Sequence, residues 1–274
     1  MALYSAFDYW PTMTTNQYSV AGRSAIVTGG SRGIGRTVAE RFAEDGASVA
    51  ICSRDQERVD EAAAAINQNV GDDRVLPVEC DVRDVDGVEA LVEATVERFG
   101  NVDVLVNNAG ANFYEPFEDI SKNGWETILD INLTGTVNCM QAASERMRAS
   151  GGGAIVNLSS FVAQFPSPNQ SHYGAAKAAI SHLTGTVAHE WAELDIRVNA
   201  VEPGVVLTPG VEHVLDEKPA DVPDRDSVDR QIGHPEEIAD LIQFLVSPAA
   251  SYLTGEVIAA RGVPQPANVE ARFP

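Results

Sequence analysis

The chain has 274 residues, of which 44% are hydrophobic, and 40 acidic side chains against 19 Lys and Arg give it a net charge of −21. This length and composition suit one large packed domain and exclude a disordered polymer. A surface this acidic repels nucleic acids and anionic membranes, so both are excluded as partners, and a small-molecule substrate is expected.

The acidic residues are spread along the whole chain, and only three of the bases are Lys. This pattern resembles the surface of haloarchaeal and other salt-accumulating proteins, in which salt screens the self-repulsion, and it predicts a halophilic protein. No apolar run reaches the roughly 18 residues of a membrane span, and the N-terminus lacks the pattern of a signal peptide. The three cysteines lie inside apolar runs, which indicates reduced thiols and a cytoplasmic location. They are Cys52, Cys80 and Cys139.

Short β-branched runs alternate with helical patterns along the chain. We expect strands within 24–30, 47–53, 74–82, 102–110, 153–160, 196–204 and 255–260, and helices up to Asp45 and over 55–66, 85–100, 121–149, 171–194 and 235–247. Nearly continuous apolar strands are typical of a parallel sheet buried on both faces. The sequence therefore predicts an α/β, doubly wound, Rossmann-type sheet of seven parallel strands with helices on both faces. The expected organisation is an extension (1–21), a single domain (22–262) and a tail (263–274).

A glycine-rich turn, TGGSRGIG, follows the first strand and opens the first helix. Its glycines permit a tight turn and a close backbone approach, and the helix N-terminus offers free N–H groups to a pyrophosphate. The residues expected to bind a dinucleotide here are Gly29, Ser31, Arg32, Gly33, Ile34 and Gly35.

The second strand ends in Ser53 and Arg54, where an acid would hold the ribose 2′-OH of NAD. No carboxylate occupies that strand end, although Asp55 is close. Arg54 and Arg32 suit a 2′-phosphate, which guanidinium groups grip in bidentate fashion. NADP(H) is therefore the preferred cofactor, with NAD(H) left open. Asp81 and Val82, after the third strand, are expected near the adenine.

Tyr173 and Lys177 lie one helical turn apart in HYGAAKAA, so their head groups can share a ligand. A positive charge beside a phenol favours the phenolate and lowers the pKa of Tyr173. A phenol tuned in this way can exchange a proton near neutral pH.

Together, TGGSRGIG, the Asn107-Asn108-Ala109-Gly110 run after the fourth strand and the Y-x-x-x-K motif resemble the short-chain dehydrogenase/reductase family. The match runs from about residue 22 to residue 262. The resemblance implies a catalytic tetrad of Asn132, Ser160, Tyr173 and Lys177. Ser160 would polarise the substrate carbonyl, Tyr173 would act as general acid or base, Lys177 would hold the nicotinamide ribose, and Asn132 would hold a water that links Lys177 to solvent.

The resemblance also extends the cofactor site to Asn108, Ala109, Gly110, Pro203, Gly204, Val206 and Thr208. The chain departs from the family pattern at two places. Glu202 replaces the small residue that usually precedes the Pro-Gly pair, and AARG stands where the last strand is commonly followed by DGG. The family's usual form implies a homotetramer, with a homodimer as the alternative. The five histidines show no metal-ligand spacing, and no metal site is expected.

The expected substrate walls carry Phe113, Tyr114, Phe161 and Phe165, and the Pro-broken segment 209–230, which includes Lys218, reads as a lid. Local similarity favours reduction of a 3-oxoacyl thioester, on acyl carrier protein or CoA. The alternatives are a sugar or secondary-alcohol dehydrogenase, such as one resembling glucose 1-dehydrogenase, and an enoyl-CoA reductase. A non-enzymatic NADP-binding regulator is the least favoured, because such proteins usually lose the Tyr or the Lys.

Overall fold

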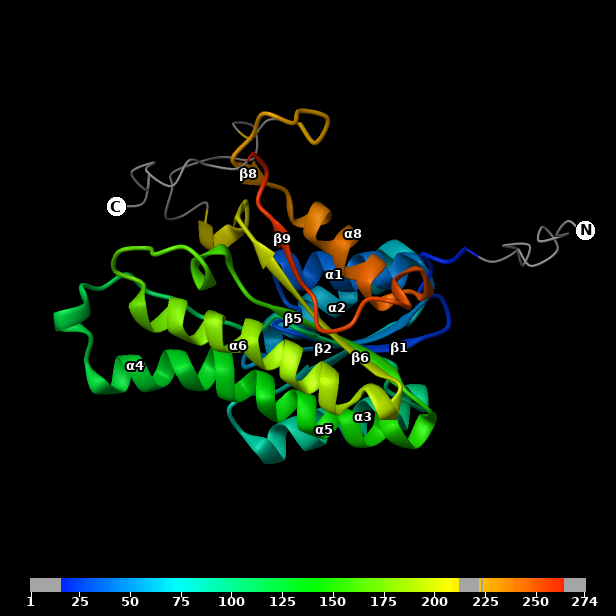
Figure 1. The fold of residues 1–274 in the computed structure, drawn as a ribbon. Helices are drawn as coiled ribbons and strands as arrows, with labels where there is room; N and C mark the ends of the chain where they lie inside the picture. The colour runs from blue at the N-terminus through cyan, green and yellow to red at the C-terminus, as the bar shows by residue number, and fades with distance from the viewer. Residues whose placement is uncertain (1–15, 212–221, 223, 264–274) are drawn as a thin grey trace, which may run out of the picture.

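Seven parallel strands form one sheet in the order β3-β2-β1-β4-β5-β6-β9, which confirms the predicted α/β architecture (Figure 1). This computed structural model describes residues 16–211, 222 and 224–263. The strands of the sheet are β1 (Ser24–Thr28), β2 (Ser48–Ser53), β3 (Val75–Glu79), β4 (Val104–Asn107), β5 (Gly153–Leu158), β6 (Ile196–Pro203) and β9 (Val257–Ala260). The helices are α1 (Gly33–Glu44), α2 (Gln56–Val70), α3 (Val85–Phe99), α4 (Lys122–Leu129), α5 (Gly135–Ser150), α6 (Ser171–Glu190) and α8 (Pro235–Val246).

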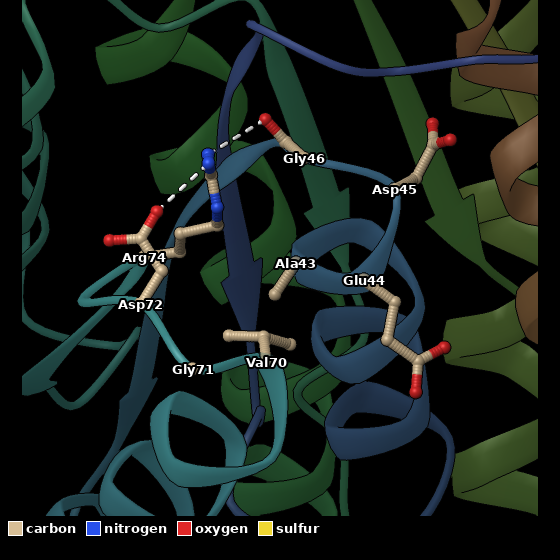
Figure 2. A pocket seen from close by; sticks show the side chains of 8 residues that line it. All are labelled: Ala43, Glu44, Asp45, Gly46, Val70, Gly71, Asp72 and Arg74. Carbon is tan, nitrogen blue, oxygen red and sulfur yellow. Dashed lines mark hydrogen bonds and ion pairs between the residues drawn. The ribbon is translucent and has the colours of Figure 1, made fainter.

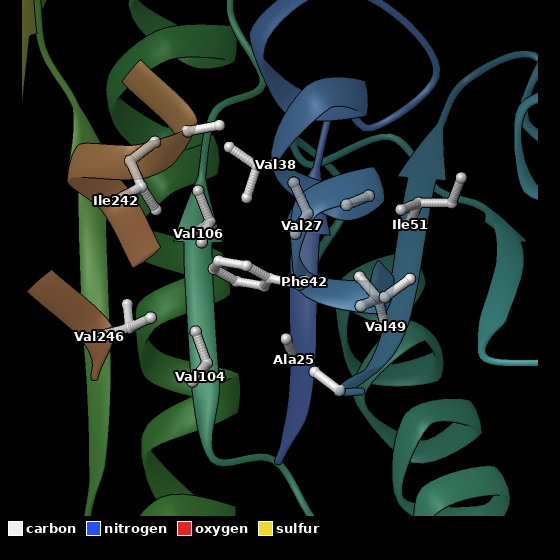
Figure 3. Close-up of a cluster of buried hydrophobic side chains, with 14 of the residues drawn as sticks. Ala25, Val27, Val38, Phe42, Val49, Ile51, Val104, Val106, Ile242 and Val246 are labelled. Atoms are coloured by element: carbon white, nitrogen blue, oxygen red, sulfur yellow. The ribbon is translucent and has the colours of Figure 1, made fainter. Parts of the chain in front are cut away.

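The sheet is covered on both faces, because its strands are apolar on both sides. Helices α1, α2 and α8 lie on one face and α3, α5 and α6 on the other (Figure 1). Phe42 of α1 is fully buried against β1 and β4, with α8 closing the cluster through Ile242 and Val246 (Figure 3). Burial of such a side chain contributes about 1.5–3 kcal/mol. The hydrophobic clusters on the two faces of the sheet together fix the position of the carboxyl ends of its strands.

The strand order reverses direction between β1 and β4, which pair directly from Ala25 opposite Val104 to Val27 opposite Val106. The chain runs outward from β1 through β2 to β3, and then returns to continue through β4 on the other side. Ligands of open parallel sheets bind at such a switch point, past the carboxyl ends of the strands. The glycine-rich turn after β1 and the Asn107–Gly110 run after β4 therefore meet at this crevice.

The helix expected over 121–149 is interrupted. It consists of α4, a π-helical turn η2 (Asp130–Thr134) and α5. The π turn accommodates one extra residue, and it contains the fully buried Asn132. The helix expected over 171–194 also ends earlier, at Glu190, and a 3-10 turn (Ala192–Leu194) follows because Trp191 leaves the helical conformation at φ −100°, ψ 5°.

Two short elements were not expected from the sequence. β7 (Val205–Val206) and β8 (Ile232–Gly233) pair in parallel as a separate ribbon above the carboxyl edge. At the N-terminus, the described part of the extension lies on α8, where the Tyr18 ring is 6.1 Å from that of Phe244. The tail beyond residue 263 and most of the expected lid, including Lys218, lie outside the described residues. None of the described helices is long and apolar enough to cross a membrane.

Candidate active site

The glycine-rich turn is held in place by the end of β4. The Thr28 hydroxyl accepts hydrogen bonds from the backbone N–H groups of Asn108 and Ala109, both at 3.0 Å. The side-chain amide of Asn108 donates to the carbonyl oxygens of Thr28 at 2.9 Å and Gly29 at 3.2 Å. Asn108 therefore shapes the turn with its side chain. A β-carbon at Gly29, where φ is +65°, would lie 2.9 Å from that amide, so only glycine fits.

The turn fits a dinucleotide pyrophosphate. Arg32 precedes α1 in an extended conformation, and no side chain caps the helix there. The N–H groups of the first turn of α1 are thus available to an anion. A β-carbon at Gly33 would lie 3.3 Å from Thr208 Cγ2, so the segment after β6 faces the turn, as expected for residues that share one cofactor. Val206, 5% exposed, lies in β7 just before Thr208.

At the carboxyl end of β2, Asp55 and Arg58 are exposed and form an ion pair. Asp55 caps α2 by accepting from the backbone N–H of Arg58 at 3.1 Å, and its carboxylate lies 3.3 Å from the Arg58 guanidinium. Ser53 is also engaged locally, since its hydroxyl donates to the Asp55 carbonyl at 2.9 Å. Arg54 is exposed. The carboxylate nearest the end of β2 in sequence is therefore occupied by helix capping.

Asp81, expected near the adenine, forms an ion pair with Arg83. The Arg83 Nη2 atom lies 2.5 Å from Asp81 Oδ2. The hydrogen bonds from Arg83 and the positive charge of Arg54 hold the pKa of Asp81 below its usual value. Arg54 therefore lies within electrostatic range of this pair. Val82 is a packing residue, because it fills the space beside Gly135 of α5 and its carbonyl accepts from Asn138 at 3.0 Å.

The four residues of the predicted tetrad come from three parts of the fold. Asn132 lies in the π turn, Ser160 at the end of β5, and Tyr173 and Lys177 on α6. A β-carbon at Gly110 would lie 2.8 Å from Asn132 Oδ1 and 3.7 Å from Lys177 Nζ, so Gly110 lies beside both side chains. The Asn132 amide donates to Ala111 at 2.8 Å and Ile128 at 2.9 Å. Its buried Oδ1 has no partner in the described part of the chain and can accept a hydrogen bond.

The Ser160 hydroxyl lies beside the Tyr173 phenol, which brings together the two groups expected at the substrate carbonyl. Burial raises the pKa of Tyr173 to about 12, because the phenolate is poorly solvated, and the neighbouring Ser160 hydroxyl offsets this rise only in part. The nearby Tyr114 phenol raises it further, so Tyr114 lies close to Tyr173. Tyr173 therefore carries its proton at neutral pH.

Lys177 is 4% exposed, and its ammonium donates to the Leu158 carbonyl at 2.6 Å. It lies 5.5 Å from the centroid of the Tyr173 ring. Burial lowers the pKa of Lys177 to about 8. The expectation that Lys177 lowers the pKa of Tyr173 is wrong for this arrangement, because burial of the phenol dominates. Of the two, Lys177 is the group that titrates near neutral pH.

The expected substrate walls are divided. Tyr114 lies near Tyr173, and Phe161 begins the 3-10 turn η3 (Phe161–Ala163) directly after Ser160. Phe165, 44% exposed, lies under the Arg261 guanidinium. Phe113 instead packs between α4 and α6, with its ring edge-on to His172 at 4.2 Å and its tip beside Gly124. His172 is fully buried, which lowers its pKa, and neither ring nitrogen has a hydrogen-bond partner in the described part of the chain.

The sequence did not indicate several residues that hold the site residues in place by hydrogen bonds. Thr28, Leu158 and Ser159 all hold tetrad or cofactor residues through hydrogen bonds. The position of Thr28, at the end of β1 and directly before two glycines, could have indicated that its hydroxyl supports the turn. Leu158 acts through its carbonyl, which no side-chain pattern reports.

A hollow of about 540 Å³ lies on the opposite edge of the sheet, where α1 and α2 end before β2 and β3 begin (Figure 2). Arg74 crosses it, donating to the Gly46 carbonyl at 3.0 Å and pairing with Asp72 at 2.9 Å. The reactive side chains lie on the other edge, so this hollow is separate from the candidate active site. No cluster of three or more His, Cys, Asp or Glu suited to a metal occurs within the described ranges.

Comparisons with known proteins show which proteins this chain is similar to. A family model described as Enoyl-(Acyl carrier protein) reductase matches residues 29–262. A 3alpha-hydroxysteroid dehydrogenase from Mediterraneibacter gnavus is 38% identical over 87% of this chain and 95% of its own length. A 3-oxoacyl-[acyl-carrier-protein] reductase from Staphylococcus aureus is 37% identical over 88% of this chain and 97% of its own. The crystal structure of L-sorbose reductase from Gluconobacter frateurii, complexed with NADPH and L-sorbose, has a TM-score of 0.81 at 32% identity and covers 90% of this chain and 98% of that one.

Proposed function

The chain belongs to the short-chain dehydrogenase/reductase family, and from this premise we propose that it is an NADP(H)-preferring reductase of 3-oxoacyl thioesters. The family assignment makes it an oxidoreductase. The proposal adds the cofactor, the substrate and the roles of the four tetrad residues.

The proximity of the Ser160 hydroxyl to the Tyr173 phenol is the observation that carries the carbonyl chemistry. Two hydroxyl groups held together can both bind one substrate oxygen. With a pKa of about 12, Tyr173 holds its proton at neutral pH and can give it to that oxygen as the general acid. Lys177, with a pKa of about 8, can replenish the proton. NADPH supplies the hydride when it is bound.

The preference for NADP(H) is supported by the charges at the end of β2. Asp55 is engaged in capping α2 and in the ion pair with Arg58, so it is poorly placed to accept a ribose hydroxyl. Arg54 is exposed, and its positive charge helps to lower the pKa of Asp81. Arg32 lies in the glycine-rich turn, directly before α1. Two guanidinium groups there favour a 2′-phosphate.

A 3-oxoacyl thioester is supported by the 37% identical acyl-carrier-protein reductase and by the complete tetrad. The family model is described as an enoyl reductase, and an enoyl reductase would reduce a carbon–carbon double bond. That reaction has less need of two hydroxyl groups that bind a carbonyl oxygen. Ser160 therefore favours a carbonyl substrate over an enoyl one.

The test is the oxidation of NADPH and NADH, followed in parallel in molar KCl with acetoacetyl-CoA as substrate. We expect turnover with a marked preference for NADPH. Equal rates with both cofactors would contradict the assignment of Arg32 and Arg54. Cofactor binding without reduction of acetoacetyl-CoA would contradict the thioester assignment and leave the tetrad in place.

A second candidate is a secondary-alcohol dehydrogenase for a steroid or sugar, which the similarity to the hydroxysteroid dehydrogenase and to L-sorbose reductase favours. The partly exposed Phe165 suits a flat apolar substrate. Oxidation of a panel of hydroxysteroids and polyols with NADP⁺ separates the two candidates, because a thioester reductase leaves the panel untouched.

A further inference from the structure

The two departures from the family pattern contact each other. Glu202, near the end of β6, is fully buried, and Arg261 follows β9, the strand that pairs with β6. The Arg261 Nη2 atom lies 3.6 Å from Glu202 Oε2. A buried carboxylate is costly unless it is paired and hydrogen-bonded, so the acid at 202 and the base at 261 compensate each other.

A third residue closes this cluster. Gln164 donates through Nε2 to Glu202 Oε2 at 2.7 Å, and its Oε1 accepts from Arg261 Nη2 at 3.2 Å. The Arg261 guanidinium also lies over the Phe165 ring, 4.8 Å from its centroid. We call Glu202, Gln164 and Arg261 the carboxylate triad. Each member contacts the other two.

One connection runs from the triad to the segment that holds Ser160. Ser160 directly precedes the 3-10 turn η3 and Gln164 directly follows it, and the Gln164 backbone N–H donates to the Phe161 carbonyl at 3.2 Å. The triad fixes the far end of this turn by the Gln164 side chain and by the stacking of Phe165. The turn therefore carries Ser160 at one end and the triad at the other.

A second connection runs to the helix under Lys177. Glu202 Oε1 accepts from the Ser181 hydroxyl at 2.9 Å, and Ser181 lies one turn beyond Lys177 on α6. The Ser181 and Ser159 hydroxyls are 2.7 Å apart, and Ser159 donates to the Lys177 carbonyl at 2.9 Å. When the Ser181 proton goes to Glu202, the single proton of Ser159 is shared between the Ser181 oxygen and the Lys177 carbonyl.

We infer that Glu202, together with Gln164 and Arg261, is a positioning unit that sets the Ser160–Phe165 segment against the substrate carbonyl and holds it in register with Lys177. The inference rests on the proposed function only for its assay with acetoacetyl-CoA. The unit touches neither reacting atom. Its effect is on how well the substrate is held, more than on the binding of the nucleotide.

The experiment compares Glu202→Gln, Arg261→Met and the double variant, with Glu256→Gln as the matched control because Glu256 is exposed just before β9. For acetoacetyl-CoA we expect Glu202→Gln to reduce kcat/KM by between about 10- and 100-fold, as for a small misplacement of reacting groups. The KM for acetoacetyl-CoA rises, and the KM for NADPH stays within about twofold. The loss in the double variant is smaller than the product of the single losses, because the two residues act as one unit.

A second readout needs no substrate. Hydrogen–deuterium exchange of the backbone N–H groups of Ala163, Gln164 and Phe165, all bonded within the turn, is expected to become faster in Glu202→Gln and unchanged in Glu256→Gln. If the wild-type protein does not reduce acetoacetyl-CoA, the proposed substrate fails and this exchange measurement still decides the inference.

The inference is overturned if Glu202→Gln lowers only the melting temperature and the yield, with KM and exchange at wild-type values, because that is a purely structural role. Should the buried substitutions prevent folding, Gln164→Ala provides the test, since Gln164 is exposed and the Glu202–Arg261 pair remains. It is expected to show the same rise in KM and in exchange to a smaller degree. Wild-type behaviour of Gln164→Ala in both readouts overturns the inference.

Discussion

Charged side chains lie in opposite surroundings at the two ends of the cofactor-binding edge. At the tetrad end, Lys177 is 4% exposed, Glu202 is fully buried, and both are held by hydrogen bonds to the chain around them. At the end near Arg54, the side chains of Asp81 and Arg83 are 28% and 39% exposed and pair in contact with water. Exposed pairs contribute little to stability, whereas a buried charge is sensitive to the loss of any partner. We infer that the buried end performs the chemistry and the exposed end selects the cofactor.

The largest effect is expected for Tyr173→Phe. Removal of the hydroxyl takes away the proton donor, and the turnover number falls about 10³-fold. Binding of NADPH, measured by the quenching of protein fluorescence, stays within about threefold of wild type, because the phenyl ring still fills the same space. A variant that turns over normally would contradict the role of Tyr173 and favour a non-enzymatic reading.

The second effect concerns the pH dependence of stability and is due to Lys177. Its pKa is about 8 in the folded protein and 10.5 in a solvated chain. Between these values the unfolded chain holds a proton that the folded protein has released, so the free energy of unfolding rises with pH through this window. Below pH 8 the cost of the buried ammonium is fully present and is on the order of 3 kcal/mol.

Lys177→Met removes this dependence. Its stability relative to wild type is expected to be greatest near pH 7 and to decrease toward pH 10, measured by urea unfolding in constant salt. Lys122→Met, at a side chain that is 88% exposed, is the matched control and should show no such trend. A stability difference that is independent of pH would contradict the burial of a titrating ammonium.

A smaller effect is expected at the exposed end. Arg54→Ala is expected to reduce kcat/KM with NADPH about tenfold, since it removes charge-assisted bonds to the 2′-phosphate, and to leave the value with NADH unchanged. Arg98→Ala is the control, because Arg98 pairs with Asp73 away from the site. Equal losses with both cofactors would mean that Arg54 does not contact the phosphate.

The smallest effect is expected from salt on the whole protein. A net charge of −21 destabilises the compact state by self-repulsion, which salt screens. The melting temperature is expected to rise by several degrees from low salt to molar KCl. A melting temperature that is constant or lower in KCl would contradict the halophilic assignment.

The fold and the tetrad were predictable because they depend on local patterns. Strand periodicity located all seven strands of the main sheet, and the family resemblance pointed to Asn132, Ser160, Tyr173 and Lys177. The π turn at Asn132 was not predictable, because a helix with one extra residue has the same composition as an uninterrupted one. The partners of Glu202 were also hidden, because Gln164 lies 38 residues before Glu202 and 97 residues separate Gln164 from Arg261.

The pKa order of the Tyr173–Lys177 pair could not be derived from spacing either. Sequence places the two head groups one turn apart, but burial decides which of them titrates near neutral pH. The role of Phe113 likewise depends on packing between α4 and α6.

The most direct test is a single-turnover measurement of NADPH oxidation by acetoacetyl-CoA at saturating NADPH, for wild type, Arg54→Ala and Tyr173→Phe. If the exposed end only selects the cofactor, saturation restores Arg54→Ala to within about twofold of wild type, while Tyr173→Phe stays about 10³-fold slower. Equal rate losses in the two variants under saturation would contradict the division of the edge into a chemical end and a selective end.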